Sequence, residues 1–300
     1  MISLREAFGQ SLVTLADRYN FVVLDADVSG GTNTNFFKNK FPKRFIQCGI
    51  AEQNMMSVAS GLSRTGIIPI ATAYGVFATL RPLDQIRNSI AYPKTNVKIV
   101  ASHPGLDVGP DGATHQAIED LAVMRAIPNM VVISPCDEKE VFEATKVILE
   151  YDGPVYMRSG RSPVPSINDE NYKFKIGKAT VLKEGKDDII VFATGVMVHR
   201  ALEAVKDSDI TVINVSTIKP IDEETIIKYS KNKTKVITCE DHNIIGGLGS
   251  AVAEVLSENA IGAKLVRIGI KDVFGSSGEP NELAELYNIS IEDIKNEIKR

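Results

Sequence analysis

Apolar and polar positions along the chain predict a regular alternation of strands and helices. β-Branched apolar runs and helical patterns follow one another in this order: 21–27, 51–65, 66–74, 84–92, 96–102, 114–126, 129–135, 137–150 and 153–159. Nearly continuous apolar strands separated by helices are typical of a parallel sheet with both faces covered. The first half of the chain is therefore expected to form an α/β domain.

The same rhythm stops and then begins again. Residues 161–177 are rich in Pro, Ser, Asn and charge, and strand patterns return at 187–195, 209–216, 234–241 and 263–269. A polar, proline-containing break between two such series is typical of a domain boundary. The pattern predicts an α/β fold of two doubly wound parallel-sheet domains, 1–166 and 173–300, with a linker at 167–172.

Composition narrows the class of protein. A chain of 300 residues, 44% of them hydrophobic, can build two cores, and a net charge of −4 without long Lys or Arg runs argues against a nucleic-acid surface. Cys48, Cys136 and Cys239 are far apart with no C-x-x-C spacing, which fits a reducing cytoplasm. Residues 1–20 have the pattern of a surface helix rather than of a signal peptide, and no apolar run approaches the roughly 18 residues of a membrane span.

Glu52 stands alone between an apolar run and a helical pattern, in FIQCGIAEQNMMSVASGL. A glutamate at a helix start can simply offset the positive end of the helix dipole. In a dry setting, a carboxyl group can instead exchange a proton near neutral pH. This stretch alone leaves both interpretations open.

The densest group of polar side chains lies in ASHPGLDVGPDGATHQ, where His103, Asp107, Asp111 and His115 are four residues apart. On a helix this spacing would suit a metal ion, but the Pro and Gly residues between them break a helix. We therefore expect a loop after the strand at 96–102, at the sheet edge where doubly wound folds bind ligands.

Two arginines follow another predicted strand in YMRSGR. The planar guanidinium of arginine matches the geometry of phosphate, and both strands end at the same sheet edge. Arg158 and Arg161 together with the His- and Asp-containing loop thus predict an anionic, hydroxylated ligand.

Several motifs in order resemble the transketolase family over essentially the whole chain. The resemblance rests on CGIAEQNM, IATAYGVFATLRPLDQIRNSIAY, DVGPDGATHQAIEDLAVMRAIPNM, SPCDEKEV, YMRSGR, INVSTIKPID and CEDHNIIGGLGSAVAE. It implies a thiamine diphosphate pyrimidine-binding domain followed by a transketolase C-terminal domain. The G-D-G…N-N run of the family's diphosphate domain is absent from this sequence.

The resemblance further implies one subunit of a split transketolase, which transfers a two-carbon ketol unit between sugar phosphates. Thiamine diphosphate would be the cofactor, and the ligands of Mg²⁺ are expected on a separate N-terminal subunit. We expect two copies of this chain to pair within a heterotetramer, with no nucleic-acid or membrane partner.

The resemblance also assigns roles to individual residues. Glu52 would bond a ring nitrogen of the cofactor's aminopyrimidine and promote its tautomerisation, and His103 and His115 would contact the sugar-phosphate substrate and take part in catalysis. The remaining matches are Tyr74 and Phe77 packing on the aminopyrimidine, Asp27 near the thiazolium side, Asp111 on a donor hydroxyl and Arg161 on the substrate phosphate.

Three alternatives stay open. A 1-deoxyxylulose-5-phosphate synthase-like section and the β subunit of a 2-oxo acid dehydrogenase share the fold and a catalytic glutamate, although DGATHQ disfavours the dehydrogenase and DQIRNS favours transketolase. The third alternative is a ligand-binding or regulatory relative without catalysis. Leu80 and Leu83 stand where many relatives carry a further aromatic residue, so the third stacking contact is unassigned.

Overall fold

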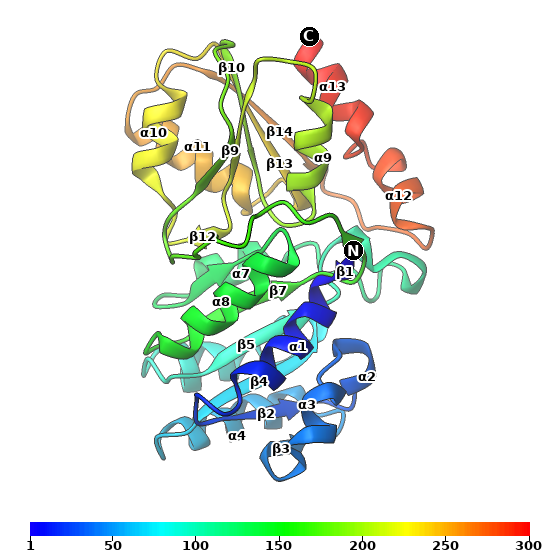
Figure 1. Ribbon diagram of the computed structural model, residues 1–300, viewed down its shortest axis with the longest axis vertical. Coiled ribbons are helices and arrows are strands. Elements are labelled where there is room, and N and C mark those ends of the chain that lie inside the picture. The colour runs from blue at the N-terminus through cyan, green and yellow to red at the C-terminus, as the bar shows by residue number, and fades with distance from the viewer.

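A seven-stranded sheet forms the centre of the first domain in the computed structural model, which describes residues 1–300 (Figure 1). Its strand order is β12-β6-β7-β5-β4-β2-β3, and all pairs are parallel except the antiparallel pair of β12 and β6. The strands are β2 (Phe21–Asp25), β3 (Phe45–Gln47), β4 (Ile68–Tyr74), β5 (Lys98–Ser102), β6 (Val131–Ile133), β7 (Val155–Ser159) and β12 (Thr217–Lys219).

Helices cover both faces of this sheet because its strands are apolar on both sides. Val23 and Val100 pack with α1 (Leu4–Leu15) and α8 (Glu138–Glu150), whereas their neighbours Leu24 and Ile99 pack on the other face in a cluster with Met55. Met55 belongs to α4 (Glu52–Ser63). The other segments are α2 (Ser29–Thr32), α3 (Asn35–Lys40), α5 (Gly75–Thr79), α6 (Leu83–Gln85), a π-helical turn η2 (Ile86–Ala91), α7 (Asp120–Ala126) and the 3₁₀ segments η1 (Pro42–Arg44) and η3 (Leu106–Asp111).

The second domain repeats this plan with five strands in the order β14-β13-β10-β11-β9. Only β9 runs antiparallel to its neighbour. The strands are β9 (Thr180–Lys183), β10 (Ile189–Ala193), β11 (Thr211–Asn214), β13 (Lys235–Asn243) and β14 (Lys264–Ile270). The helices are α9 (Met197–Ala204), α10 (Glu223–Ser230), α11 (Leu248–Glu258), α12 (Pro280–Leu286) and α13 (Ile291–Lys299).

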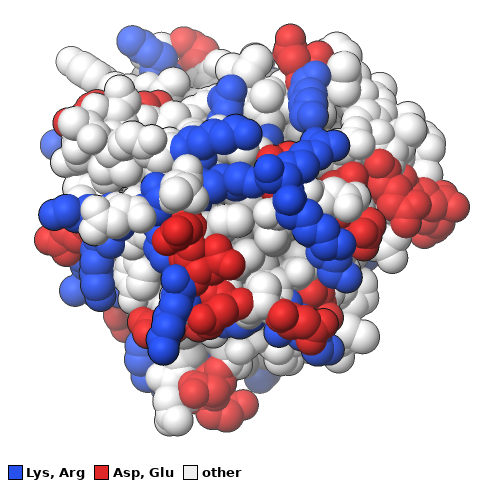
Figure 2. Space-filling view, turned by 90° about the horizontal axis from the view of Figure 1, so that it is seen from above, with Lys and Arg blue, Asp and Glu red and all other residues white.

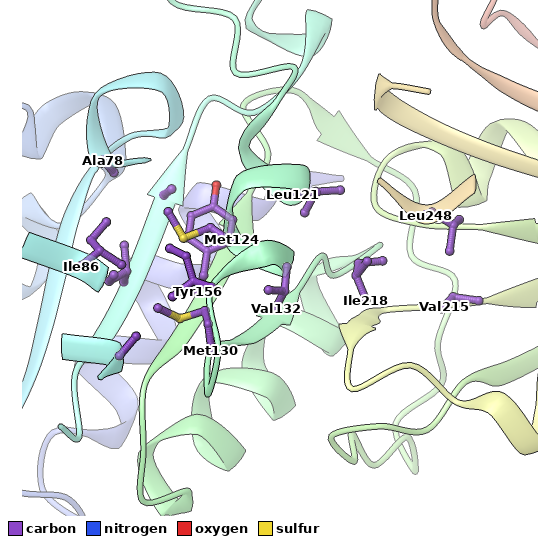
Figure 3. Packing of buried hydrophobic residues seen from close by; sticks show 14 of the residues in the cluster. Ala78, Ile86, Leu121, Met124, Met130, Val132, Tyr156, Val215, Ile218 and Leu248 are labelled. Atoms are coloured by element: carbon purple, nitrogen blue, oxygen red, sulfur yellow. The ribbon is translucent and has the colours of Figure 1, made fainter. Parts of the chain in front are cut away.

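One hydrophobic cluster continues from the first domain into the second. Leu121, Met124 and Val132 of the first domain belong to the same buried cluster as Ile218 and Leu248 of the second (Figure 3). Burial of apolar surface contributes about 25 cal/mol per Å² removed from water, so this shared core favours a fixed arrangement of the two domains. A small sheet of β1 (Ile2–Ser3) and β8 (Pro163–Val164) ties the N-terminus to the segment between the domains.

The α/β prediction is confirmed, and every predicted strand is present; each begins or ends within two residues of the predicted range, and β13 and β14 extend beyond it at their C-terminal ends. The short strands β1, β3, β8, β9 and β12 were not predicted. The helix predicted at 114–126 begins only at Asp120. Residues 113–115 form a turn instead, and the carbonyls of Ala117 and Ile118 accept hydrogen bonds from Gly105 N–H and Asn243 N–H, each at 2.8 Å, rather than from a helix.

The outer surface of the second domain carries charges of both signs. Viewed from the top of Figure 1, Lys and Arg side chains form a band with Asp and Glu beside it (Figure 2). None of the helices combines the length and the apolar character that a bilayer span requires.

Candidate active site at the edge of the first sheet

The strand register brings the predicted site residues to one edge of the first sheet. Tyr74, Ser102 and Ser159, the last residues of β4, β5 and β7, lie opposite one another in consecutive strands. β2 and β3 end beside them in the same parallel sheet. Because every parallel strand delivers its carboxyl end to the same side, the segments that follow these strands meet there.

Glu52 is the first residue of α4, at the end of the connection from β3. Its side chain is 5% exposed, and its Oε1 accepts a hydrogen bond from Nη1 of Arg81 at 2.7 Å. The Arg81 guanidinium also lies over the Phe77 ring, 4.0 Å from the centroid. Glu52 and Phe77 are therefore linked by one cationic group, and Glu52 does more than offset a helix dipole.

Four rings form a cluster next to this pair. The ring centroids of Tyr74 and His103 are 4.0 Å apart, and those of Phe77 and His115 are 5.1 Å apart with a nearly perpendicular arrangement. Tyr74 lies 6.2 Å from both Phe77 and His115. Gly31 makes room for Tyr74, because a Cβ atom at this position would lie 2.0 Å from the tyrosine hydroxyl. Aromatic contacts of this kind are worth about 0.5–1.5 kcal/mol each beyond burial.

His103 is buried, and both of its ring nitrogens have a neighbouring polar group. Its backbone has a positive φ of 58°. Its Nδ1 lies 2.8 Å from Oγ of Ser102, and its Nε2 lies 3.5 Å from Nη1 of Arg5. Burial, and then the charges of Arg5 and Arg161, lower the pKa of His103 to about 3, so the ring is neutral near pH 7. Since Arg5 has only donors, this geometry makes Nε2 the acceptor and places the proton on Nδ1.

Asp111 and Arg161 are both more exposed than His103. Asp111 is exposed at the end of η3, and its charge acts with burial to raise the pKa of Tyr74. Arg161 is partly buried, donates from Nη1 to the Val108 carbonyl at 2.8 Å, and is close enough to lower the pKa of His103. Both residues thus face the same edge as the rings.

Asp27 occupies a separate position. It is exposed after β2 with a φ of 66°, and its N–H donates to Oε1 of Gln47 at 3.0 Å. The structure gives it no contact with the ring cluster. The loop between His103 and His115 is not a continuous helix, since η3 is interrupted at Gly109. No group of three or more His, Cys, Asp or Glu side chains is placed to hold a metal ion.

The prediction that Arg158 serves an anionic ligand is wrong. Its guanidinium is buried and forms a two-pronged ion pair with Asp120, with Nε 2.8 Å from Oδ2. It also donates to the carbonyls of Ala117 and Asp241, at 3.3 and 3.0 Å. Burial opposes ionisation of Asp120, but the Arg158 charge outweighs it and holds the pKa of Asp120 below its usual range. Arg158 therefore joins the two domains.

Sequence reasoning missed Arg81 and Arg5. Arg81 follows Phe77 by four residues, a spacing that brings side chains together on one helix face, so a signal was present. Arg5 left no local signal, because its partners Gly31 and His103 are 26 and 98 residues away along the chain.

The first domain is a parallel α/β domain with an acid, packed rings and a neutral histidine at its strand ends, and it packs on a second α/β domain. The comparisons with known proteins show the family to which this arrangement belongs. Residues 1–166 match the family description "Transketolase, pyrimidine binding domain", and residues 177–294 match "Transketolase, C-terminal domain". The chain belongs to the transketolase family.

Individual relatives match over nearly their whole length. A Methanocaldococcus jannaschii protein described as "Putative transketolase C-terminal section" is 49% identical, over 98% of this chain and 95% of that protein. The 6-deoxy-6-sulfo-D-fructose transketolase subunit SqwH of a Clostridium species is 39% identical, over 97% and 92%. A solved structure described as "Split gene transketolase, inactive beta4 tetramer" is 46% identical with a TM-score of 0.92, covering 100% of this chain and 98% of that one.

Proposed function

We propose that this chain is the C-terminal subunit of a thiamine diphosphate-dependent transketolase and acts with a separately encoded N-terminal subunit. The observation that carries this proposal is the continuous contact from Glu52 through Arg81 and Phe77 to the rings of His115 and Tyr74. It joins the acid and the aromatic surface that a thiamine enzyme needs. The full-length match to a split-gene transketolase chain supports the division into two subunits.

The residues present fit an aminopyrimidine. The Arg81 guanidinium is a planar, cationic group with N–H donors, and it both stacks on Phe77 and donates to Glu52. A protonated aminopyrimidine has the same chemical character, so Glu52, Phe77 and Tyr74 would hold it. When bound, thiamine diphosphate supplies the nucleophilic carbon that carries the ketol unit.

Glu52 would hold a proton at the pyrimidine ring nitrogen. Its Oε1 is engaged by Arg81, whereas the structure gives its Oε2 no hydrogen-bond partner. One oxygen is thus fixed and the other is free for a ligand. Positioned acids and bases of this kind contribute about 10²–10⁴-fold to rate.

The polar residues at the same edge would bind the sugar. Nε2 of neutral His103 can accept a hydrogen bond from a sugar hydroxyl that replaces its long contact of 3.5 Å with Arg5, which a protonated ring could not do. His115 and Asp111 supply further polar groups, and Arg161 supplies the charge for a terminal anion. We propose a phosphate for this anion; a sulfonate, as in the substrate named for the Clostridium relative, has similar geometry. Asp27 would lie nearer the thiazolium side.

We propose that the Mg²⁺ ligands lie on the N-terminal subunit and that two copies of this chain pair within a heterotetramer. The solved split-gene relative is described as an inactive tetramer of β chains. The isolated chain should likewise assemble and have negligible activity, because half of the cofactor site would be missing.

The test is co-expression with a candidate N-terminal subunit, followed by co-purification and an assay for ketol transfer with thiamine diphosphate and Mg²⁺. We expect transfer from a ketose phosphate to an aldose phosphate by the pair only. Ketol transfer by the chain alone would contradict the two-subunit proposal. Formation of 1-deoxyxylulose 5-phosphate and CO₂ from pyruvate and glyceraldehyde 3-phosphate by the pair, without ketol transfer, would favour the synthase alternative.

A further inference from the structure

The loop that carries the predicted substrate-binding residues is held from behind by the second domain. Asp241, near the end of β13, accepts the N–H of Leu106 at Oδ1 (2.9 Å) and the N–H of Asp107 at Oδ2 (3.2 Å). One carboxylate therefore binds two consecutive backbone donors of the loop that begins at His103. Charge-assisted hydrogen bonds of this kind are about twice as strong as neutral ones.

The loop is shaped to fit this carboxylate. Gly105 has a φ of +66°, and a Cβ atom at this position would lie 2.1 Å from Oδ2 of Asp241. Any side chain here would push the loop away from the second domain. The close approach requires glycine and shows that loop and carboxylate are packed directly against each other.

Asp241 is itself held rigidly. It is 5% exposed, and its carbonyl accepts a hydrogen bond from Nη1 of Arg158 at 3.0 Å. Arg158 is fixed in turn by the buried ion pair with Asp120. The loop is thus bonded to Asp241 of the second domain, which is bonded in turn to the Arg158–Asp120 ion pair of the first.

The far side of the same loop is attached to the end of β7. Oδ2 of Asp107 accepts the N–H of Ser162 at 2.9 Å, and the Val108 carbonyl accepts Nη1 of Arg161 at 2.8 Å. A shift of residues 106–108 would therefore move Arg161 and the segment leading to Asp111. Glu52 and Phe77 lie on other elements and form no hydrogen bond with residues 103–111, and the ring contact of Tyr74 with His103 connects the two parts of the site.

We propose that Asp241 is a positioning residue through which the second domain sets the affinity of the site for its sugar substrate. This inference rests on the proposed function. Asp241 fixes residues 103–111 so that His103, Asp111 and Arg161 meet the substrate together, and it leaves cofactor binding at Glu52 and Phe77 unaffected.

The test compares Asp241→Asn with Glu240→Gln in the full chain. Glu240 is the adjacent residue, is also buried, and accepts hydrogen bonds from two consecutive N–H groups, those of Leu248 and Gly249, at 2.7 and 2.8 Å. These partners belong to the second domain itself. Both variants lose a carboxylate bonded to the backbone, but only Asp241→Asn loosens the loop.

Two measurements separate positioning from general destabilisation. Hydrogen–deuterium exchange of residues 103–112 in the chain alone should become roughly tenfold faster in Asp241→Asn and stay unchanged in Glu240→Gln. In the two-subunit enzyme, the Asp241 change should raise the KM for the ketose phosphate roughly tenfold while kcat and thiamine diphosphate affinity stay close to normal.

Unchanged exchange in Asp241→Asn, or an equal rise of KM in Glu240→Gln, would overturn the inference. Absence of ketol transfer by the unmodified pair would contradict the proposed function instead, and the exchange measurement would still decide whether Asp241 holds the loop.

Discussion

The two domains share an architecture but use the same sheet edge differently. In the first domain, the carboxyl ends of the strands lead to partly exposed groups such as His115, Arg161 and Arg81. In the second domain, the carboxyl end of β13 carries Glu240, Asp241 and His242, and all three are buried. One edge is open to solvent, whereas the other is covered by the first domain.

The carboxyl edge of the second sheet, where a ligand could otherwise bind, is occupied by residues of the first domain. Asn243 N–H bonds the Ile118 carbonyl at 2.8 Å, and His242 lies 4.0 Å from the carboxylate of Asp120 across the domain boundary. Burial raises the pKa of Glu240 to about 7, against the opposing effect of the Gly249 and Leu248 N–H groups. The rule that parallel sheets bind ligands at carboxyl ends thus predicts where ionisable groups gather, while domain packing decides which edge can act.

The largest effect should come from the acid at the open edge. Glu52→Gln keeps the size of the side chain but removes its ability to exchange a proton, so turnover of the two-subunit enzyme should fall by about 10²–10⁴-fold. Steady-state kinetics of the purified pair measures this change. Glu258→Gln, at an exposed position at the end of α11, is the control and should be normal. Near-normal turnover of Glu52→Gln would leave Glu52 with only a structural role.

The next largest effect concerns the pH dependence of stability, to which His103 of the open edge and His242 of the covered edge should contribute in the same direction. The pKa values of His103 and His242 are lowered to about 3 and about 4, by burial first and then by nearby arginines. The folded state thus favours the neutral rings. Their stabilising contribution is complete above the unfolded pKa of about 6.5 and is lost as pH falls toward the folded value.

His103→Asn should therefore make stability less dependent on pH. Between pH 7 and pH 4.5, linkage assigns to His103 a loss of about 2–3 kcal/mol in the free energy of unfolding, which the variant should not show. Urea unfolding of both proteins at the two pH values measures it. Equal pH dependence in the two proteins would mean that His103 is solvated and that the open edge extends further inward than the structure shows.

The strands and the sheet edge were predictable because each depends on local sequence. Nine strands each have an apolar run in the sequence. Residues that follow parallel strands lie at the same edge of a sheet. The pattern and the resemblance together therefore predicted a common site for Glu52, Phe77, His103 and Arg161. By contrast, β12 is only three residues long and adds to the sheet of the other domain. Nothing in its three side chains specifies that partner.

Arg158 shows a second limit. The sequence offers two arginines near the end of one strand, and both suit a phosphate. The difference lies in the strand itself, because Arg158 is within β7 on the same face as Tyr156, and both side chains bond Asp120. Arg161 comes after the strand and is partly exposed. The alternation of strand side chains was a usable signal, but the carboxylate that pairs with Arg158 comes from α7, 38 residues away.

The third prediction concerns specificity for the anion at the open edge. Arg161→Ala should raise the KM for phosphorylated sugars roughly tenfold or more, since charged hydrogen bonds in a partly dry setting are worth about 1.5–3 kcal/mol. A non-phosphorylated donor such as hydroxypyruvate should be affected little, and thiamine diphosphate binding should be unchanged. Equal weakening of both donors would show that Arg161 only supports the Val108 carbonyl, to which it already donates.

The smallest effect should be the contribution of the Arg81–Glu52 ion pair to stability, because water competes for the Arg81 guanidinium. Its side chain is 48% exposed although Glu52 is 5% exposed. Half-solvated ion pairs and cation–π contacts are each worth about 1 kcal/mol or less. A double-mutant cycle of Arg81→Ala and Glu52→Gln, followed by urea unfolding, should therefore give a coupling below about 1 kcal/mol that decreases further at high salt.

A coupling above about 2 kcal/mol, insensitive to salt, would mean that the pair is as dry as the buried carboxylates of the second domain. The open edge would then be closed in the free chain, and a ligand would have to displace Arg81 before reaching Glu52.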